Sequence, residues 1–424
     1  MKTSEIVLSY KALVKIFEQD LPFRVALKAV CQEEKVEPIT KQICASLLGA
    51  ELRHHLLFEY LINKEFLNIT RDEMFLISLL LANQCFAKKI DLDTAKKIVV
   101  NELIKLNSEI NKKELSEFLD KNTDIKSLIP EDINQTSFEY YTYRYNTPMW
   151  LIKMWKKHFG DFFLRKILLA NTKLPRLIAS VNPFVSSKEE ILSNSDFVET
   201  CEDGALEYKK NTSLSLTKEA IEKKIYPSNL AIKYLLNRLV IDDFDKVCLY
   251  QGESGRNTYL ELINKKGENL ELYLLFKSPK DYASFIKNNY DLELTKTQAE
   301  YIKGNFDVHV SSKVNLFMVY AESSSFANIR TSPDYLIHFK QEELDQIIDR
   351  EKELLDNAKD LVEDDGRLVY IIDTLSKKES KGIIQDFLKE NPEFSLEEER
   401  QFFPFDKYDS SMYFAILHKG VIDD

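Results

Sequence analysis

The stretch V-N-L-F-M-V-Y-A-E-S-S-S-F-A-N-I-R-T-S-P-D, from Val314 to Asp334, begins with an apolar run of strand length, Val314–Tyr320, that ends in a polar turn. A helical pattern with one apolar face follows at Glu342–Val362. Further apolar runs of strand length lie at Lys246–Gln251, Leu270–Phe276 and Leu368–Asp373. Short apolar runs that alternate with helical patterns are typical of a mostly parallel sheet with crossover helices. Residues 216–424 are therefore predicted to form a doubly wound, Rossmann-like α/β domain.

The N-terminal part of the chain has a different pattern. Apolar residues recur at helical spacing through residues 1–130, for example at Leu13, Val14 and Phe17. Few glycines or prolines interrupt this pattern, so an all-α bundle is expected. The longest apolar run, Met74–Ala87, is too short to span a bilayer and is predicted to be a core helix.

The composition is that of a globular protein with two or three domains. The chain has 424 residues, of which 44% are hydrophobic and 30% are charged. The net charge of −11 argues against an overall cationic field that attracts nucleic acid, although a local basic face remains open. Only 10 residues are glycine, the residue on which phosphate-binding turns are usually built.

The cysteine pattern indicates a reducing compartment. The five cysteines are far apart and form no C-x-x-C pair, and four of them sit in apolar or helical-looking surroundings, so buried free thiols and a cytoplasmic location are expected. The N-terminus carries charges too early for a signal peptide. The motifs that hold Glu322, Ser323 and Asp373 contain no histidine, so no metal site is predicted. The cysteines are Cys31, Cys44, Cys85, Cys201 and Cys248.

Residues 131–215 are predicted to be a connector domain rich in aromatic and basic residues. Aromatic rings beside cations can stack on bases and neutralise phosphates. The connector therefore supplies four candidates for RNA contact, which are Arg144, Lys153, Lys156 and Lys157. Trp150 and Trp155 either stack on bases in the same way or pack in the core of the connector. Core packing is the interpretation favoured for both.

A second basic group lies in the helical pattern A-S-L-L-G-A-E-L-R-H-H-L-L-F-E-Y-L-I, from Ala45 to Ile62. It consists of Arg53, His54 and His55. These residues either contact RNA or a protein, or they form a solvated helix face, and the pattern favours neither reading over the other.

Taken in order along nearly the whole chain, these segments resemble the RsmB (Fmu/Sun) family of bacterial rRNA cytosine-5 methyltransferases. That family has D-A-P-C-S after a buried strand and then an arginine-containing turn that ends in P-D. Here Ala321, Ser324 and Arg330 fit the pattern, as does Pro333-Asp334. The resemblance implies a NusB-like helical domain, a connector and a class I methyltransferase domain that uses S-adenosylmethionine. It also implies rRNA as a partner, with Arg330 among the candidate RNA contacts.

The cofactor loop departs from the family pattern. The family's D-L-C-A-A-P-G-G-K-T corresponds to L-Y-Q-G-E-S-G-R-N-T at Leu249–Thr258, where only Gly255 and Thr258 keep their types. Arg256 puts a long side chain where the backbone approaches the ligand. The loop positions matched to the cofactor are Gln251, Gly252, Gly255, Arg256, Asn257 and Thr258.

The acidic positions of the cofactor site are also replaced. Phe276 stands where the family has the acid that accepts the ribose hydroxyls, and a phenyl ring accepts no such hydrogen bond. Tyr320 replaces the aspartate of the fourth strand. Asn305, in Gly304-Asn305, matches the family's G-D and still offers a contact for an adenine amine. The resemblance therefore implies a degraded S-adenosylmethionine site.

Neither catalytic cysteine is present. The family adds a thiolate to cytosine C6, and a second cysteine assists release of the enzyme. The nucleophile position falls on Asp373 and the second cysteine position falls on Ser323. Cys201 and Cys248 are too far away along the chain for a small change of register to bring them in. By the family's mechanism the protein is expected to be inactive.

Three functions remain open from the sequence. The first is an RNA-binding pseudoenzyme that acts on rRNA or ribosome assembly without methyl transfer. The second is an active RNA methyltransferase with a diverged site. The third is a protein-interaction module built on the NusB-like bundle. A hydrolytic or metal site made of Glu322, Ser323 and Asp373 is a weaker alternative, because two carboxylates alone are a poor metal signal.

Overall fold

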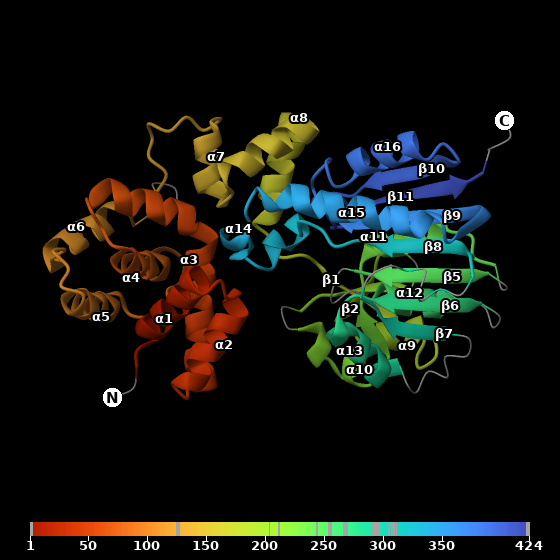
Figure 1. Ribbon diagram of the computed structural model, residues 1–424. Helices are drawn as coiled ribbons and strands as arrows, with labels where there is room; N and C mark the ends of the chain where they lie inside the picture. The colour runs from red at the N-terminus through yellow and green to blue at the C-terminus, as the bar shows by residue number, and fades with distance from the viewer. Residues whose placement is uncertain are drawn as a thin grey trace. The chain divides into compact units, whose positions relative to one another are not determined.

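The chain forms two compact units, which are described separately (Figure 1). The first unit contains Met1–Lys173 and Asn328–Lys340, and the second contains Leu174–Ala327 and Gln341–Asp424. The domain boundaries predicted at residues 130 and 215 stay predictions. The computed structural model describes residues 3–123, 128–202, 204–210, 213–242, 245–252, 257–265, 270–289, 297–303, 306, 310 and 312–420.

The first unit is helical, as predicted. Side-chain caps begin several of its helices, including a capping box in which Thr70 and Glu73 bond each other's backbone. Its helices are α1 (Glu5–Glu18), α2 (Phe23–Glu33), α3 (Pro38–Glu65), α4 (Arg71–Ala82), the π-helical turn η1 (Asn83–Ala87), α5 (Leu92–Lys105), α6 (Lys112–Lys121), α7 (Phe138–Tyr145), α8 (Met149–Asn171) and α14 (Tyr335–His338). Met74–Ala87 forms α4 and η1 and is largely buried, which confirms the predicted core helix.

A segment distant in sequence completes the first unit. Asp334 is buried, and its Oδ2 accepts a hydrogen bond of 2.8 Å from the Phe23 backbone N–H at the start of α2. Pro22, the residue before α2, provides no side-chain cap, so Asp334 satisfies one of the free N–H groups of this helix. Trp150 stacks on Phe339 with ring centroids 6.1 Å apart. The aspartate of the family's P-D motif therefore acts as a helix cap here.

The second unit begins with a small antiparallel sheet in the order β2-β3-β1-β4. These strands were not predicted from the sequence. They are β1 (Leu177–Val181), β2 (Phe197–Glu199), β3 (Ala205–Tyr208) and β4 (Ile225–Pro227). Short helices α9 (Lys188–Leu192), η2 (Leu214–Leu216) and α10 (Lys218–Ile221) accompany them.

A seven-stranded sheet in the order β10-β11-β9-β8-β5-β6-β7 forms the rest of the second unit. The five strands from β9 to β7 pair in parallel, which confirms the predicted Rossmann-like fold. The strands are β5 (Lys246–Gln251), β6 (Glu271–Phe276), β7 (Thr297–Tyr301), β8 (Val314–Tyr320), β9 (Val362–Asp373), β10 (Phe394–Gln401) and β11 (Met412–Lys419). The antiparallel strand β10 was not predicted.

Helices cover both faces of this sheet because its strands present apolar side chains on both sides. Val247 and Leu249 belong to the core shared with α11 (Leu230–Arg238), α12 (Thr258–Lys265) and α13 (Pro279–Asn289). Cys248 and Tyr250 belong to the core shared with α15 (Glu343–Lys359) and α16 (Lys381–Glu390). Within the described part of the chain, no helix is long and apolar enough to cross a membrane.

Candidate functional site

The parallel pairing brings the predicted site positions to one edge of the sheet. Gln251 at the end of β5 pairs with Phe276 on one side and with Tyr320 on the other. Tyr320 in turn pairs with Ile371, two residues before the end of β9 at Asp373. Ligands of doubly wound folds bind at this carboxyl edge. The positions that the sequence analysis singled out are therefore neighbours in the fold.

Phe276 is fully buried at this edge. Its ring contacts the rings of Tyr259, Tyr282 and Phe285, with centroid distances of 5.6, 6.1 and 5.4 Å. Tyr259 and Phe285 are also buried and belong to the same core cluster. The end of β6 thus offers an aromatic packing surface where the family places a hydrogen-bond acceptor.

Tyr320 and Asp373 bond to each other. The Tyr320 hydroxyl donates a hydrogen bond of 2.9 Å to Asp373 Oδ2. The Tyr320 side chain is fully buried and Asp373 is 2% exposed. The replacements at the family's fourth-strand acid and nucleophile positions therefore form one buried pair.

The backbone at this edge is closely packed. A Cβ added to Gly252 would lie 2.8 Å from Tyr320 O, closer than side chains tolerate, and the Gly252 N–H donates to that same carbonyl at 2.9 Å. Asn257 Nδ2 donates 2.9 Å to Pro227 O. Lys277 and Glu322, which follow β6 and β8, form an ion pair. Gly252 is explained by the approach of two strand ends, without a ligand.

The turn after β8 is fixed by a carboxyl group that the sequence analysis missed. Glu379 is fully buried and accepts hydrogen bonds from the Ser324 N–H at 2.6 Å and the Ser324 hydroxyl at 2.8 Å. The Thr374 hydroxyl donates to the same carboxyl group at 2.7 Å. The Ser323 hydroxyl donates 3.0 Å to Asp373 O. Burial raises the pKa of Glu379, while the donors from Ser324 and Thr374 lower it.

A second buried acid lies nearby, on α15. Glu351 is 1% exposed. Burial, and then the charge of Glu379, raise its pKa well above the ordinary value. Its neighbour Tyr370 donates its hydroxyl to Glu379 O at 2.9 Å. No sequence signal distinguishes Glu351 and Glu379 from the exposed acids around them.

The cavity beside Thr258 and Tyr320 is small. It measures about 100 Å³ and is lined by Pro227, Ser228, Asn229, Ile232, Asn257, Thr258, Glu261 and Tyr320. Sites for ligands of drug size are typically about 300–1,000 Å³. Three predicted cofactor positions, Gly255, Arg256 and Asn305, lie outside the described residues.

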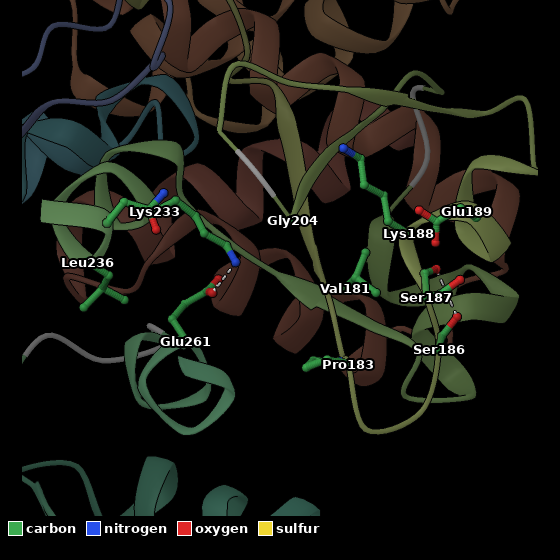
Figure 2. A pocket seen from close by; sticks show the side chains of 11 residues that line it. Val181, Pro183, Ser186, Ser187, Lys188, Glu189, Gly204, Lys233, Leu236 and Glu261 are labelled. Carbon is green, nitrogen blue, oxygen red and sulfur yellow. Dashed lines mark hydrogen bonds and ion pairs between the residues drawn. The ribbon is translucent and has the colours of Figure 1, made fainter. Parts of the chain in front are cut away.

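A larger groove of about 630 Å³ lies on the other side of Glu261, between the small sheet and α11 (Figure 2). Glu261 Oε2 forms an ion pair of 2.7 Å with Lys233, and its Oε1 accepts from the hydroxyls of Ser180 and Ser228, each at 2.5 Å. Ser180 begins the stretch S-V-N (Ser180–Asn182), which resembles an R-V-N motif of the family with serine in place of the arginine. Its hydroxyl therefore helps to hold a buried carboxylate.

The cysteines are placed as the sequence predicted, as free thiols. Four are buried, and Cys201 is exposed. Cys248 is fully buried inside β5, and burial raises the pKa of its thiol well above the ordinary value. Among the described residues, no group of three or more His, Cys, Asp or Glu side chains is arranged to hold a metal ion.

Of the basic group on α3, only Arg53 is exposed. His55 is 6% exposed and its Nδ1 lies 2.6 Å from Glu51 Oε1. His54 stacks on Phe86 with centroids 3.7 Å apart. Burial, Arg53 and Arg144 lower the pKa of His54 to about 4, so its ring is neutral at pH 7. His55 therefore takes no part in an exposed basic face.

Arg53 on α3 and Arg144 on α7 are exposed, and both act on the same histidine, His54. Asn146, which follows α7 in the left-handed conformation, holds the end of α7 against α3. Its side chain accepts from the Leu56 N–H at 3.0 Å and donates to Leu52 O at 2.7 Å. The fold thus brings together two arginines that are distant in sequence.

The three candidate lysines lie on α8 and are exposed. Lys153 and Lys156 lie over the ring of Phe138, at 5.9 and 5.3 Å from its centroid. Lys157 is their exposed neighbour. Trp155 is fully buried, as predicted, while Trp150 is half-buried.

Arg330 is 7% exposed, and its Nε donates 2.9 Å to Lys173 O in the first unit. Its side chain is engaged at the end of α8. RNA contact by Arg330 stays a prediction that this geometry does not favour.

Comparison with known proteins identifies similar sequences. Residues 277–414 match the family model described as 16S rRNA methyltransferase RsmB/F. A relative from Bacillus subtilis (strain 168), "Probable ribosomal RNA small subunit methyltransferase B", is 22% identical over 412 residues. The match covers 93% of this chain and 90% of that protein. The similarity therefore extends over both units.

Solved structures share the fold. The crystal structure of PH0851 matches with a TM-score of 0.72 and 16% identity, over 99% of this chain and 100% of its own. NSun6 from Pyrococcus horikoshii, in a structure with SFG, matches with a TM-score of 0.56 and 14% identity, over 65% of this chain and 99% of its own. At these identities the structures establish the shared fold.

Proposed function

Because the chain belongs to the RsmB/Fmu family, we propose that it binds ribosomal RNA and transfers no methyl group to it. The hydrogen bond between Tyr320 and Asp373 carries this proposal. Asp373 stands at the nucleophile position, and the family's step requires a thiolate that adds to cytosine C6. A buried carboxylate already bonded to Tyr320 supplies no such nucleophile.

The remaining cysteines support the same conclusion. The Cys248 thiol is fully buried within a strand, and its raised pKa keeps it protonated and unreactive. Cys201 is exposed and belongs to the turn between β2 and β3 of the small sheet, not to the strand ends that carry Ser323 and Asp373. Neither thiol replaces the missing catalytic pair.

The described residues do not fit S-adenosylmethionine. Phe276 and Tyr320 each replace a carboxylate, and a hydrogen bond to a charged group contributes about 1.5–3 kcal/mol. Two such losses correspond to roughly 10²- to 10⁴-fold weaker binding.

Local charge supports RNA binding despite the net charge of −11. Arg53 and Arg144 meet near His54, and three exposed lysines lie on α8. Each phosphate neutralised by such a cation strengthens binding in low salt. The helical region is predicted to be NusB-like, and a protein partner for it is the alternative role.

Fluorescence anisotropy with fragments of purified small-subunit rRNA, over a range of salt concentrations, tests RNA binding. The variant Lys153→Gln/Lys156→Gln/Lys157→Gln should bind more weakly, and the salt slope should fall by about 2, since each phosphate contact contributes about 0.7 on single strands. The control variant Lys97→Gln/Lys112→Gln/Lys113→Gln removes the same charge from exposed sites on α5 and α6. Equal slopes for the two variants would contradict the role of α8.

A radiolabel assay tests the second half of the proposal. The protein is incubated with methyl-labelled S-adenosylmethionine and unmodified rRNA, and no label should enter the RNA. Incorporation that depends on this protein would establish the diverged methyltransferase instead. A partner that stays bound after nuclease treatment, combined with no RNA affinity, would favour the protein-interaction module.

A further inference from the structure

The second half of α8 carries a feature that the predicted lysine group does not include. Gly160 has φ 79° and ψ 171°, so the helix breaks there into two segments. A side chain at this position would be strained by the backbone angle alone, because no atom lies within 4 Å of an added Cβ. Lys156 crosses the break with an ion pair of 2.9 Å to Asp161. This ion pair links the lysine-bearing segment to the second segment.

The second segment presents an aromatic ring among cations. Phe162 is 65% exposed, an unusual position for a large apolar side chain. Lys166 lies over its ring with Nζ 4.2 Å from the centroid, and Phe163 contacts its edge at a centroid distance of 5.6 Å. Phe162, Lys166 and Leu169 are spaced i, i+4, i+7 and share one helix face. Leu169 is also exposed, at 52%.

The surrounding charge favours an anionic partner. From Met149 to Asn171, α8 contains five Lys and Arg residues and one acid, Asp161, in a chain whose net charge is −11. Arg165 is exposed beside Phe162, and both Arg165 and Arg144 act on the Tyr145 hydroxyl. Cations and rings therefore continue from α7 to the end of α8.

We propose that Phe162, Arg165 and Lys166 form a binding strip for unpaired RNA, in which a base stacks on Phe162 while the two cations contact the backbone phosphates. This inference rests on the proposed RNA binding and specifies its chemistry. An exposed ring beside cations suits single strands, because every base offers a face for stacking. A duplex keeps its bases stacked inside and offers only phosphates.

The test uses the full chain and fluorescence anisotropy with a labelled decauridine and a labelled RNA duplex. Phe162→Leu keeps the apolar surface and removes the ring, and should weaken decauridine binding about five- to hundredfold. Its salt slope and duplex affinity should not change. Phe162→Tyr keeps the ring and should bind within about twofold of the native chain.

The charge variant Arg165→Gln/Lys166→Gln should lower the salt slope on single strands by about 1.4. The matched control, Lys112→Gln/Lys113→Gln on α6, should leave it unchanged. If the native chain binds RNA and Phe162→Leu binds decauridine equally well, the inference about the strip is wrong and the proposed RNA binding is unaffected. No RNA binding by the native chain would remove both. An unaffected RNA affinity together with a changed oligomeric state in Phe162→Leu would assign the strip to protein contact and overturn the inference.

Discussion

Removal of one hydroxyl group tests whether the former catalytic edge now serves the stability of the fold. The Tyr320 hydroxyl donates 2.9 Å to Asp373 Oδ2, and both residues are at most 2% exposed. Tyr320→Phe deletes this donor and keeps the ring and its packing. The Asp373 carboxylate then stays buried without that hydrogen bond.

The magnitude follows from the charge and burial of the pair. Hydrogen bonds to charged groups contribute about 1.5–3 kcal/mol, and the buried position prevents water from replacing the lost donor. Tyr320→Phe is therefore expected to destabilise the second unit by about 1.5–3 kcal/mol. For domains of about 150–250 residues this corresponds to a decrease in melting temperature of roughly 3–12 °C.

The positions of the two tryptophans allow the destabilisation to be assigned to one unit. The chain has two tryptophans, Trp150 and Trp155, and both belong to the first unit. Urea denaturation followed by far-ultraviolet circular dichroism reports both units, while tryptophan fluorescence reports the first. Tyr320→Phe should lower the urea midpoint of the second unit, which circular dichroism reports. The midpoint of the tryptophan fluorescence transition should not change. The control Tyr282→Phe deletes a hydroxyl from a half-exposed ring and should change stability by less than about 0.5 kcal/mol.

A double-mutant cycle provides the refutation. With Asp373→Ala in the background, Tyr320→Phe should lose its effect, which gives a coupling energy of about 1.5–3 kcal/mol. A coupling energy near zero would mean that the hydrogen bond does not hold this edge together. The account of Asp373 as a structural residue would then be refuted.

Three further predictions concern positions outside this pair. Gly366→Ala should lower the circular-dichroism melting temperature, at a cost of about 1–3 kcal/mol, because the new Cβ would lie 3.0 Å from Asn315 O and 2.8 Å from another backbone carbonyl. Burial raises the pKa of Glu351 above its ordinary 4.5, so the folded state holds its proton longer than the unfolded state and stability falls as pH rises above 4.5. Glu351→Gln should flatten this decline in urea denaturation across pH, and an unchanged slope would exclude Glu351 as its source. Asp334→Ala removes the acceptor of the Phe23 N–H and should destabilise the first unit by about 0.5–2 kcal/mol in tryptophan fluorescence, whereas no shift would exclude a capping role.

Strands β5, β6, β8 and β9 could be predicted because burial on both faces leaves a continuous apolar run, whereas β7, T-Q-A-E-Y, has no such run and was not predicted. The bounds of β5 and β8 agree with the predicted Lys246–Gln251 and Val314–Tyr320. The small sheet was missed because its strands have only three to five residues, too few for a pattern of alternation to emerge. The antiparallel strand β10 was missed because charged residues dominate its sequence, S-L-E-E-E-R-Q after Phe394.

The site could be predicted position by position, but its interactions could not. The resemblance gave the register that placed Phe276, Tyr320 and Asp373 at neighbouring strand ends. The bond between Tyr320 and Asp373 joins residues 53 positions apart, and the role of Glu379 depends on donors from two separate turns. Likewise, sequence spacing placed His55 on a basic helix face, whereas packing of α3 against its neighbours buries it beside Glu51.

Calorimetric titration of S-adenosylmethionine and S-adenosylhomocysteine into the full chain tests the central claim most directly. NSun6 from Pyrococcus horikoshii, whose structure was obtained with SFG, serves as the positive control in a parallel titration with SFG. The account predicts no binding heat at millimolar ligand, which corresponds to a binding free energy weaker than about −4 kcal/mol. Micromolar binding would contradict it and show that the edge formed by Phe276, Tyr320 and Asp373 still accepts the cofactor.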